Sequence, residues 1–151
     1  EALNEIWKSR QPDANLIAFG MRIGVGQAFQ AAREFITDGR LKDEERISLI
    51  QKLAELRDGD SQEIFLNLTR SNSEPEIKKA SLNSLRRYSA HRIGRNLIEG
   101  IPNWEPEVRK TAISVLAGRP NWGNWLIQAV DEKRIPREDI PFDVLFLIEG
   151  R

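Results

Sequence analysis

The chain has 151 residues, its 23 basic side chains are balanced by 23 acidic ones, and it contains no cysteine. The balanced charge neither favours nor excludes a nucleic-acid partner, whereas the absence of cysteine excludes disulfides, thiol catalysis, iron–sulfur ligation and covalent haem attachment within this chain. The longest apolar run, residues 144–148, is far shorter than the roughly 20 residues that a membrane span needs.

Apolar residues recur with helical spacing along the chain, and no stretch alternates convincingly as a β-strand would. Short groups of Gly, Pro, Asn and Asp separate the helical stretches, and Gly20, Gly24 and Gly26 loosen the first of them. The sequence predicts a leading helix near 2–9, helix pairs at about 13–37, 43–70, 74–101 and 105–133, and a trailing helix near 140–150.

The first helices of two pairs resemble each other. The segment "SEPEIKKASLNSL" (73–85) aligns with "WEPEVRKTAISVL" (104–116), 31 residues later. The equivalent positions are Ile77 with Val108, Ser81 with Ala112, Leu82 with Ile113, and Leu85 with Leu116. Such internal similarity indicates a repeat protein.

The second helices of the pairs also repeat, with a period of 29 residues. One position is occupied by Ile64, Ile93 and Trp122, and the position four residues later by Leu68, Leu97 and Leu126. Because residues four apart lie on one face of a helix, both positions are expected in the core.

Recurring helix pairs of about 30 residues are typical of an α-solenoid, in which each pair buries its apolar face against its neighbours. The sequence therefore predicts an all-α fold, an α-solenoid of about four HEAT-like helix pairs plus terminal helices. We expect residues 1–151 to form a single HEAT-like domain. The chain begins with Glu1 rather than Met, so we expect it either to be processed or to be a piece of a longer protein.

Two capping boxes are predicted at helix starts. Ser73 and Glu76 have the spacing of one box, and Asp60 and Glu63 have the spacing of another. Capping is also our preferred explanation of the acidic segment 58–63, because it lacks most of the ligands of a calcium-binding loop.

The tryptophans of the last pair have different predicted roles. Trp122 occupies a position that is isoleucine in the preceding pairs, so we expect it in the core. Trp125 occupies a position that is asparagine in them, at Asn67 and Asn96, which makes it the better candidate for a contact surface. Alternatively, Trp125 covers the trailing helix.

A basic stretch lies in the third pair. Between residues 77 and 98 there are six cations and no acidic side chain: Lys78, Lys79, Arg86, Arg87, Arg92 and Arg95. Such a charged zone can orient a partner protein, and the alternative is a solvated surface paired with neighbouring repeats. No catalytic, cofactor-binding or metal-ligating set is indicated, since the only histidine is His91 and no glycine-rich phosphate loop is complete.

The segment "SVLAGRPNWGNWLIQAVDEKRIPREDI" (114–140) resembles the end of the HEAT-like segment in large multidomain proteins of planctomycetes, verrucomicrobia and some bacteroidetes. In those proteins an Arg-Pro-x-Trp stretch leads a helix that ends in a Gly-x-Ile-Pro-x-x-Asp-like loop. Lys133-Arg134 departs from the usual glycine. The residues that fit the pattern are Arg119, Pro120, Trp122, Leu126, Ile135, Pro136 and Asp139.

The resemblance implies a non-enzymatic spacer in a membrane-bound dehydrogenase, between a sugar-dehydrogenase-like β-propeller and a c-type cytochrome module. Its partners would be these neighbouring domains or another protein, and its location would be extracytoplasmic, in the periplasm; a cytoplasmic location is the alternative. HEAT-like DNA glycosylases suggest a second function, nucleic-acid binding through the basic third repeat, but they resemble this chain only at the level of fold.

The trailing segment 142–148 is apolar on nearly every side, as expected for a helix between two neighbours. We therefore expect either that the natural chain continues past Arg151 or that a second copy covers this helix in a dimer.

Overall fold

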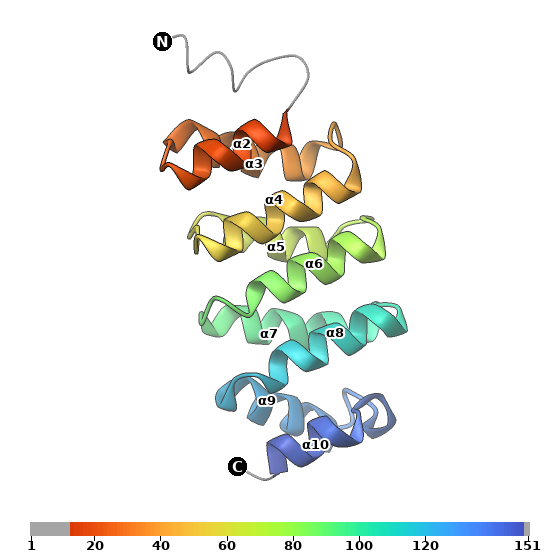
Figure 1. The fold of residues 1–151 in the computed structure, drawn as a ribbon. Helices are drawn as coiled ribbons and strands as arrows, with labels where there is room; N and C mark the ends of the chain where they lie inside the picture. Colours follow the sequence, from red (N-terminus) through yellow and green to blue (C-terminus); the bar gives the residue numbers. More distant parts are fainter. Residues whose placement is uncertain (1–12, 150–151) are drawn as a thin grey trace. The chain divides into compact units, whose positions relative to one another are not determined.

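The computed structural model describes residues 13–149 (Figure 1), so the predicted leading helix at 2–9 lies outside the described residues. Within this range the chain is all-helical, with no strand, which confirms the predicted fold class at that level. The α-helices are α2 (Ala14–Arg22), α3 (Gly26–Asp38), α4 (Asp43–Glu55), α5 (Ser61–Arg70), α6 (Pro75–Leu85), α7 (His91–Gly100), α8 (Pro106–Ala117), α9 (Pro120–Asp131) and α10 (Phe142–Glu149). Two 3₁₀ segments, η1 (Ile101–Asn103) and η2 (Arg137–Asp139), complete the described part of the chain.

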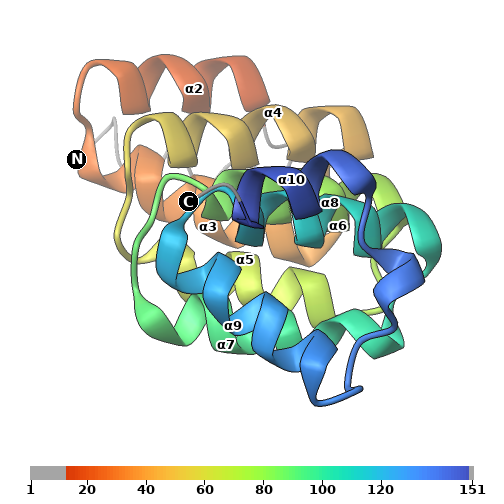
Figure 2. The same cartoon turned by 90° about the horizontal axis from the view of Figure 1, so that it is seen from below.

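The chain divides into two compact units, the first ending at Arg87 and the second beginning at Tyr88. In the first unit, α4 packs against α2 and α6, and α3 packs against α5, so the helices form two layers (Figure 1). In the second unit, α7 packs against α9 and α8 against α10, which again gives two layers (Figure 2). Each unit thus contains two layers of helices.

Positions that align in the sequence are buried alike in the two units. In α6, residues Ile77, Ser81, Leu82 and Leu85 are fully buried, and so are their counterparts in α8, Val108, Ala112, Ile113 and Leu116. The aligned residues of α6 and α8 thus form apolar faces of the same pattern, each buried within its own unit.

The aligned positions of the second helices are also buried, with one exception. Ile93 and Trp122 are fully buried and Leu68, Leu97 and Leu126 are buried, but Ile64 is only half-buried. In α5 the next residue, Phe65, is fully buried instead, and its side chain is larger than that of Ile64.

Three helices end in Schellman motifs, in which the last turn is closed by a residue in the left-handed conformation. Gly24 follows α2 with a φ of 83°, Arg57 follows α4 with a φ of 53°, and Lys133 follows α9 with a φ of 61°. Behind Lys133, the amide of Arg134 donates to the carbonyl of Ala129 at 2.9 Å. Lys133 therefore adopts, without being glycine, the conformation that the glycine of the resembling pattern would favour.

Both predicted capping boxes are wrong. The N-cap of α6 is Glu74 rather than Ser73, because Pro75 occupies the first helical position and holds the preceding residue extended. At the start of α5, Asp60 has helical backbone angles and its side chain makes no capping hydrogen bond. The carboxylate of Asp58 instead accepts a hydrogen bond from the Ser61 hydroxyl at 2.5 Å.

Candidate functional site

The six cations of the predicted basic stretch are divided between the two units. Lys78 and Lys79 lie on α6, and Arg86 and Arg87 directly follow it, whereas Arg92 and Arg95 lie on α7 in the second unit. Lys79 forms an ion pair with Glu76 at 2.7 Å, and Arg86 donates to the side chain of Asn83 at 3.2 Å. Two of the six cations, Arg87 and Arg95, border surface hollows.

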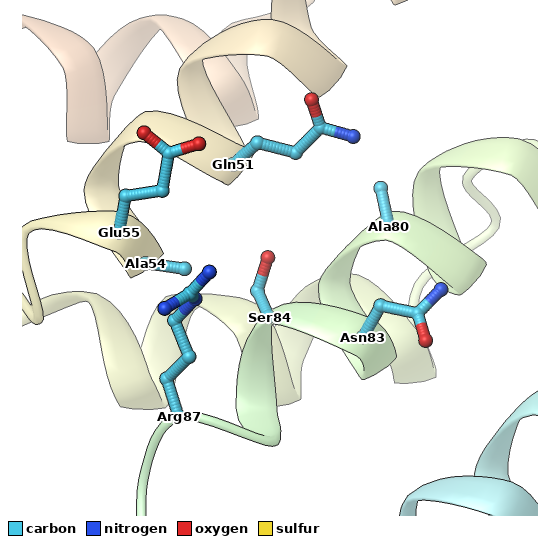
Figure 3. A pocket seen from close by; sticks show the side chains of 7 residues that line it. All are labelled: Gln51, Ala54, Glu55, Ala80, Asn83, Ser84 and Arg87. Carbon is cyan, nitrogen blue, oxygen red and sulfur yellow. The ribbon is translucent and has the colours of Figure 1, made fainter.

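The hollow of the first unit lies between α4 and α6 (Figure 3) and has a volume of about 280 Å³. We call it the α4–α6 hollow. Its lining residues are spaced three or four apart on each helix, so each helix presents one face to it. The lining residues are Gln51, Ala54, Glu55, Ala80, Asn83, Ser84 and Arg87.

The floor of the α4–α6 hollow is buried and its rim is exposed. Ala54, Ala80 and Ser84 are buried, whereas the amide, carboxylate and guanidinium groups of the rim reach solvent. Glu55 pairs with Lys52 at 3.4 Å across one turn of α4. Among the described residues, the side chain of Arg87 has no ion-pair or hydrogen-bond partner. The hollow therefore combines groups of both charges with neutral donors and acceptors.

The hollow of the second unit lies between α7 and α9 and has a volume of about 320 Å³. We call it the Trp125 hollow, because Trp125 is its only aromatic lining residue. Its lining residues are Arg95, Ile98, Glu99, Trp125, Gln128 and Arg134. Gln128 and Arg134 both donate to the carboxylate of Glu132, at 2.9 Å and 2.8 Å. These hydrogen bonds lower the pKa of Glu132 and hold the two donors at the edge of the hollow.

Trp125 is half-buried and makes its ring contacts with α7. The guanidinium of Arg95 lies 5.5 Å from the centroid of the indole, within the range of a cation–π interaction. The imidazole of His91 meets the same indole edge-on, with the ring centroids 5.6 Å apart. The side chain predicted as a contact candidate thus joins two helices and also borders a hollow.

Trp122 lies in the core of the second unit against a glycine. A Cβ atom on Gly94 would lie 2.6 Å from Cδ1 of Trp122, closer than real carbon atoms approach. Gly94 of α7 therefore leaves the space that the indole of α9 fills. Gly100 and Trp104 form a second such pair, with a distance of 2.5 Å from the added Cβ atom to the ring.

The most strongly paired carboxylate in the described residues of the first unit is Asp58. Nε and Nη2 of Arg33 donate to the two carboxylate oxygens of Asp58, at 2.7 Å and 2.8 Å. This ion pair joins α3 to the turn after α4. Burial alone would raise the pKa of Asp58, but the hydrogen bonds from Arg33 and Ser61 outweigh it, and the pKa lies below its ordinary value. The same pair raises the pKa of Arg33. This geometry is that of a structural ion pair.

Three of the residues predicted as contact candidates, Arg87, Arg95 and Trp125, line the two hollows. The sequence did not indicate the side chains around them as contact candidates: Gln51, Asn83 and Ser84 in the first hollow, and Glu99, Gln128 and Arg134 in the second. One signal was present, because residues 80, 83, 84 and 87 are small or polar at the spacing of a helix face. Without knowing which helix packs next to it, this face cannot be distinguished from a solvated one.

The described residues contain neither of two other kinds of feature. Among the side chains that the structure describes, no group of three or more His, Cys, Asp or Glu residues is arranged to hold a metal ion. No helix in the same range is long and apolar enough to cross a membrane. Comparisons with family models, curated proteins and solved structures found no match for this chain.

Proposed function

We propose that this chain is a non-catalytic scaffold, an α-solenoid of HEAT-like helix pairs that holds neighbouring domains or a protein partner. The observation that supports it is the matched burial of α6 and α8, at the positions that the sequence repeat pairs. A face that recurs in this way is expected when successive helix pairs stack on one another. Scaffolds of this kind use the half-exposed positions for contacts, because the buried positions are committed to stacking.

The resemblance of residues 114–140 makes the proposal more specific. In this form the chain is a spacer between a sugar-dehydrogenase-like propeller and a c-type cytochrome module, outside the cytoplasm. The left-handed conformation of Lys133 supports it, because the pattern carries glycine at that position. Any oxidation of a substrate belongs, on this proposal, to the flanking modules.

Helix α10 is a candidate contact surface of the scaffold. It buries Val144 and Ile148, but Phe142, Phe146 and Leu147 are 83%, 73% and 58% exposed. The exposed residues of α8 include the polar Glu107, Lys110 and Ser114 instead. On this proposal a neighbouring domain or a second copy covers the exposed face of α10.

The spacer proposal is tested by reading the native coding sequence across both ends of this segment. We expect a propeller-type domain upstream and a Cys-x-x-Cys-His signature within about a hundred residues downstream. A stop codon directly after Arg151 would contradict the spacer form and leave a free-standing adaptor.

The alternative function, nucleic-acid binding, is tested by titrating a fluorescent duplex with the protein at several salt concentrations. Binding through phosphates should weaken steeply as salt increases. We expect no such binding, because Lys79 is paired with Glu76 and Arg95 lies over Trp125. Affinity that falls steeply with salt, and that is lost in an Arg92→Ala, Arg95→Ala variant, would favour the alternative.

A further inference from the structure

The α4–α6 hollow combines a small apolar floor with a polar rim. Ala54 and Ala80 leave the central space open, and the buried Ser84 adds one hydroxyl group to the floor (Figure 3). A floor of methyl groups admits a narrow chain of atoms but offers no flat aromatic surface for a sugar ring or a base. The shape therefore favours a slender ligand.

The neutral groups of the rim match a peptide backbone. Gln51 of α4 and Asn83 of α6 border the hollow, and each carries a primary amide with both donors and an acceptor. A peptide unit offers one N–H donor and one carbonyl acceptor, and the primary amide of Gln51 can satisfy both. The side-chain oxygen of Asn83 already accepts a hydrogen bond from Arg86, so Asn83 contributes its N–H donors. Among the described residues, the side chains of Gln51 and Ser84 have no hydrogen-bond partner within the protein.

The charged groups set the direction of the ligand. Arg87 presents a guanidinium group that is not engaged by any of the carboxylates whose side chains are described, although Glu55 borders the same hollow. A guanidinium binds a carboxylate with two parallel hydrogen bonds. The carboxylate of Glu55, which is paired with Lys52, disfavours an anion at its own position. An acidic group of the ligand therefore belongs at Arg87.

The length of the site fits a short segment. Ala80 and Arg87 are seven residues apart on the course of α6, a distance of about 10 Å at 1.5 Å per residue. An extended chain covers this distance with about three residues, at roughly 3.3 Å each.

We propose that the α4–α6 hollow binds an extended peptide segment of about three residues that carries a carboxylate, with the carboxylate on Arg87 and the peptide backbone against Gln51, Asn83 and Ser84. This inference rests on the proposed scaffold function and names the chemistry of one partner. The carboxylate is either an acidic side chain or a chain terminus, and the peptide probes below distinguish these sources.

The test is a titration of the ¹⁵N-labelled full chain, followed by NMR. The first probe is acetyl-Ala-Ser-Ala-Asp-Ala-amide, the second has Ala for Asp and a free carboxyl terminus, and the third has Asn for Asp and an amidated terminus. We expect the first or second probe to shift the amide signals of residues 51–55 and 80–87. The third probe should bind about tenfold more weakly, because it lacks the charge-assisted pair with Arg87.

Substitutions distinguish specific binding of the peptide in the α4–α6 hollow from nonspecific binding to the protein surface. Arg87→Ala should weaken binding of the acidic probe about tenfold, and Gln51→Ala by a smaller factor; both side chains are exposed, so the fold should persist. Lys79→Ala removes a cation of the same helix outside the hollow and should leave affinity unchanged within twofold.

Three results would overturn the inference. The first is that the acidic probes and the amide probe bind with equal affinity, and the second is that the Arg87→Ala variant binds the acidic probe as tightly as the wild type. The third is that maltose, added instead of a peptide, shifts the same amide signals. If the peptides do not bind, the spacer proposal is unaffected, since its test depends on the flanking coding sequence. Conversely, peptide binding together with a stop codon after Arg151 would retain the docking site and exclude the spacer.

Discussion

Neighbouring helices pack through different side chains in the two units. In the first unit, the neighbouring helices α4 and α6 approach through alanines and leave a polar hollow with an alanine floor. In the second, α7 and α9 are joined by tryptophans, one filling the space above a glycine and one half-exposed beside two arginines. Helices α4 and α6 are the first helices of their predicted pairs, whereas α7 and α9 are second helices. The difference therefore shows two kinds of helix contact: small side chains leave a polar hollow open, and an indole over a glycine fills the space.

The largest expected effect concerns Trp122, the residue that most distinguishes the second unit. Trp122→Ala should lower the free energy of unfolding by about 3–5 kcal/mol, because it leaves a large cavity. Ile64→Ala changes the equivalent but half-buried position of the first unit and should cost less than about 2 kcal/mol. Urea unfolding followed by circular dichroism measures both.

The contact between Trp122 and Gly94 can be tested separately. Gly94→Ala should cost about 1–3 kcal/mol by overpacking against the indole. In the double variant with Trp122→Ala, the loss should be smaller than the sum by about 0.5 kcal/mol or more, because the added methyl group occupies the cavity. Additive losses would show that the two residues do not share a packing space.

The next largest effect on stability is expected for the ion pair between Arg33 and Asp58 in the first unit. Asp58→Asn should cost about 1–3 kcal/mol at neutral pH, because Arg33 loses a bidentate charged partner. The pKa of Asp58 is lower in the folded state than in the unfolded state, so this stability is fully present above the unfolded pKa of about 3.9. It is lost as the pH falls through the lower folded pKa.

The difference in stability between wild type and Asp58→Asn should therefore be constant from pH 7 to about 5 and shrink in more acidic solution. Asp60→Asn is the matched control, since Asp60 is exposed and 3.6 Å from the same guanidinium. It should change stability by less than about 0.5 kcal/mol. A pH-independent difference for Asp58→Asn would contradict the assigned ion pair.

A smaller effect is expected at Trp125. Substitution by asparagine, which the repeat carries at this position, should cost about 1 kcal/mol through the contacts with Arg95 and His91. A double-mutant cycle with Arg95→Ala isolates the cation–π part, expected at about 0.5–1 kcal/mol. A coupling energy of zero would mean that the guanidinium only lies near the indole.

The smallest effect has the opposite sign. Lys133→Gly should raise stability by about 1 kcal/mol or less, because glycine adopts the left-handed conformation without steric cost. Arg57→Gly is the counterpart in the first unit and should act in the same direction. Lys110→Gly, in the interior of α8, should instead lower stability by about 1 kcal/mol.

The helices were predictable from the sequence because their signals are local. Pro75, Pro106 and Pro120 each mark a helix start, and the predicted pair 43–70 matches α4 and α5 from Asp43 to Arg70. The capping box at Ser73 is wrong because Pro75 fixes the start of α6 more strongly than a serine two residues earlier. The box at Asp60 is wrong because Asp60 adopts helical backbone angles and its side chain caps no amide.

The hollows were not predictable in the same way. The α4–α6 hollow brings residue 51 beside residue 83, and Gly94 accommodates a ring from residue 122. Neither relation follows from helical spacing, because it depends on which helices are neighbours and on the size of both side chains. Sequence alone found the helices and the cations but not the surfaces that they form together.

The tryptophans of the described residues, Trp104, Trp122 and Trp125, all belong to the second unit. In a Trp7→Phe background, which removes the indole outside the described range, intrinsic fluorescence becomes an optical reporter of that unit alone. Trp104 and the fully buried Trp122 should emit at shorter wavelength than the half-exposed Trp125, which is open to quenching by the neighbouring imidazole of His91. Removing Trp125 by substitution therefore separates the reading of the core from that of the surface.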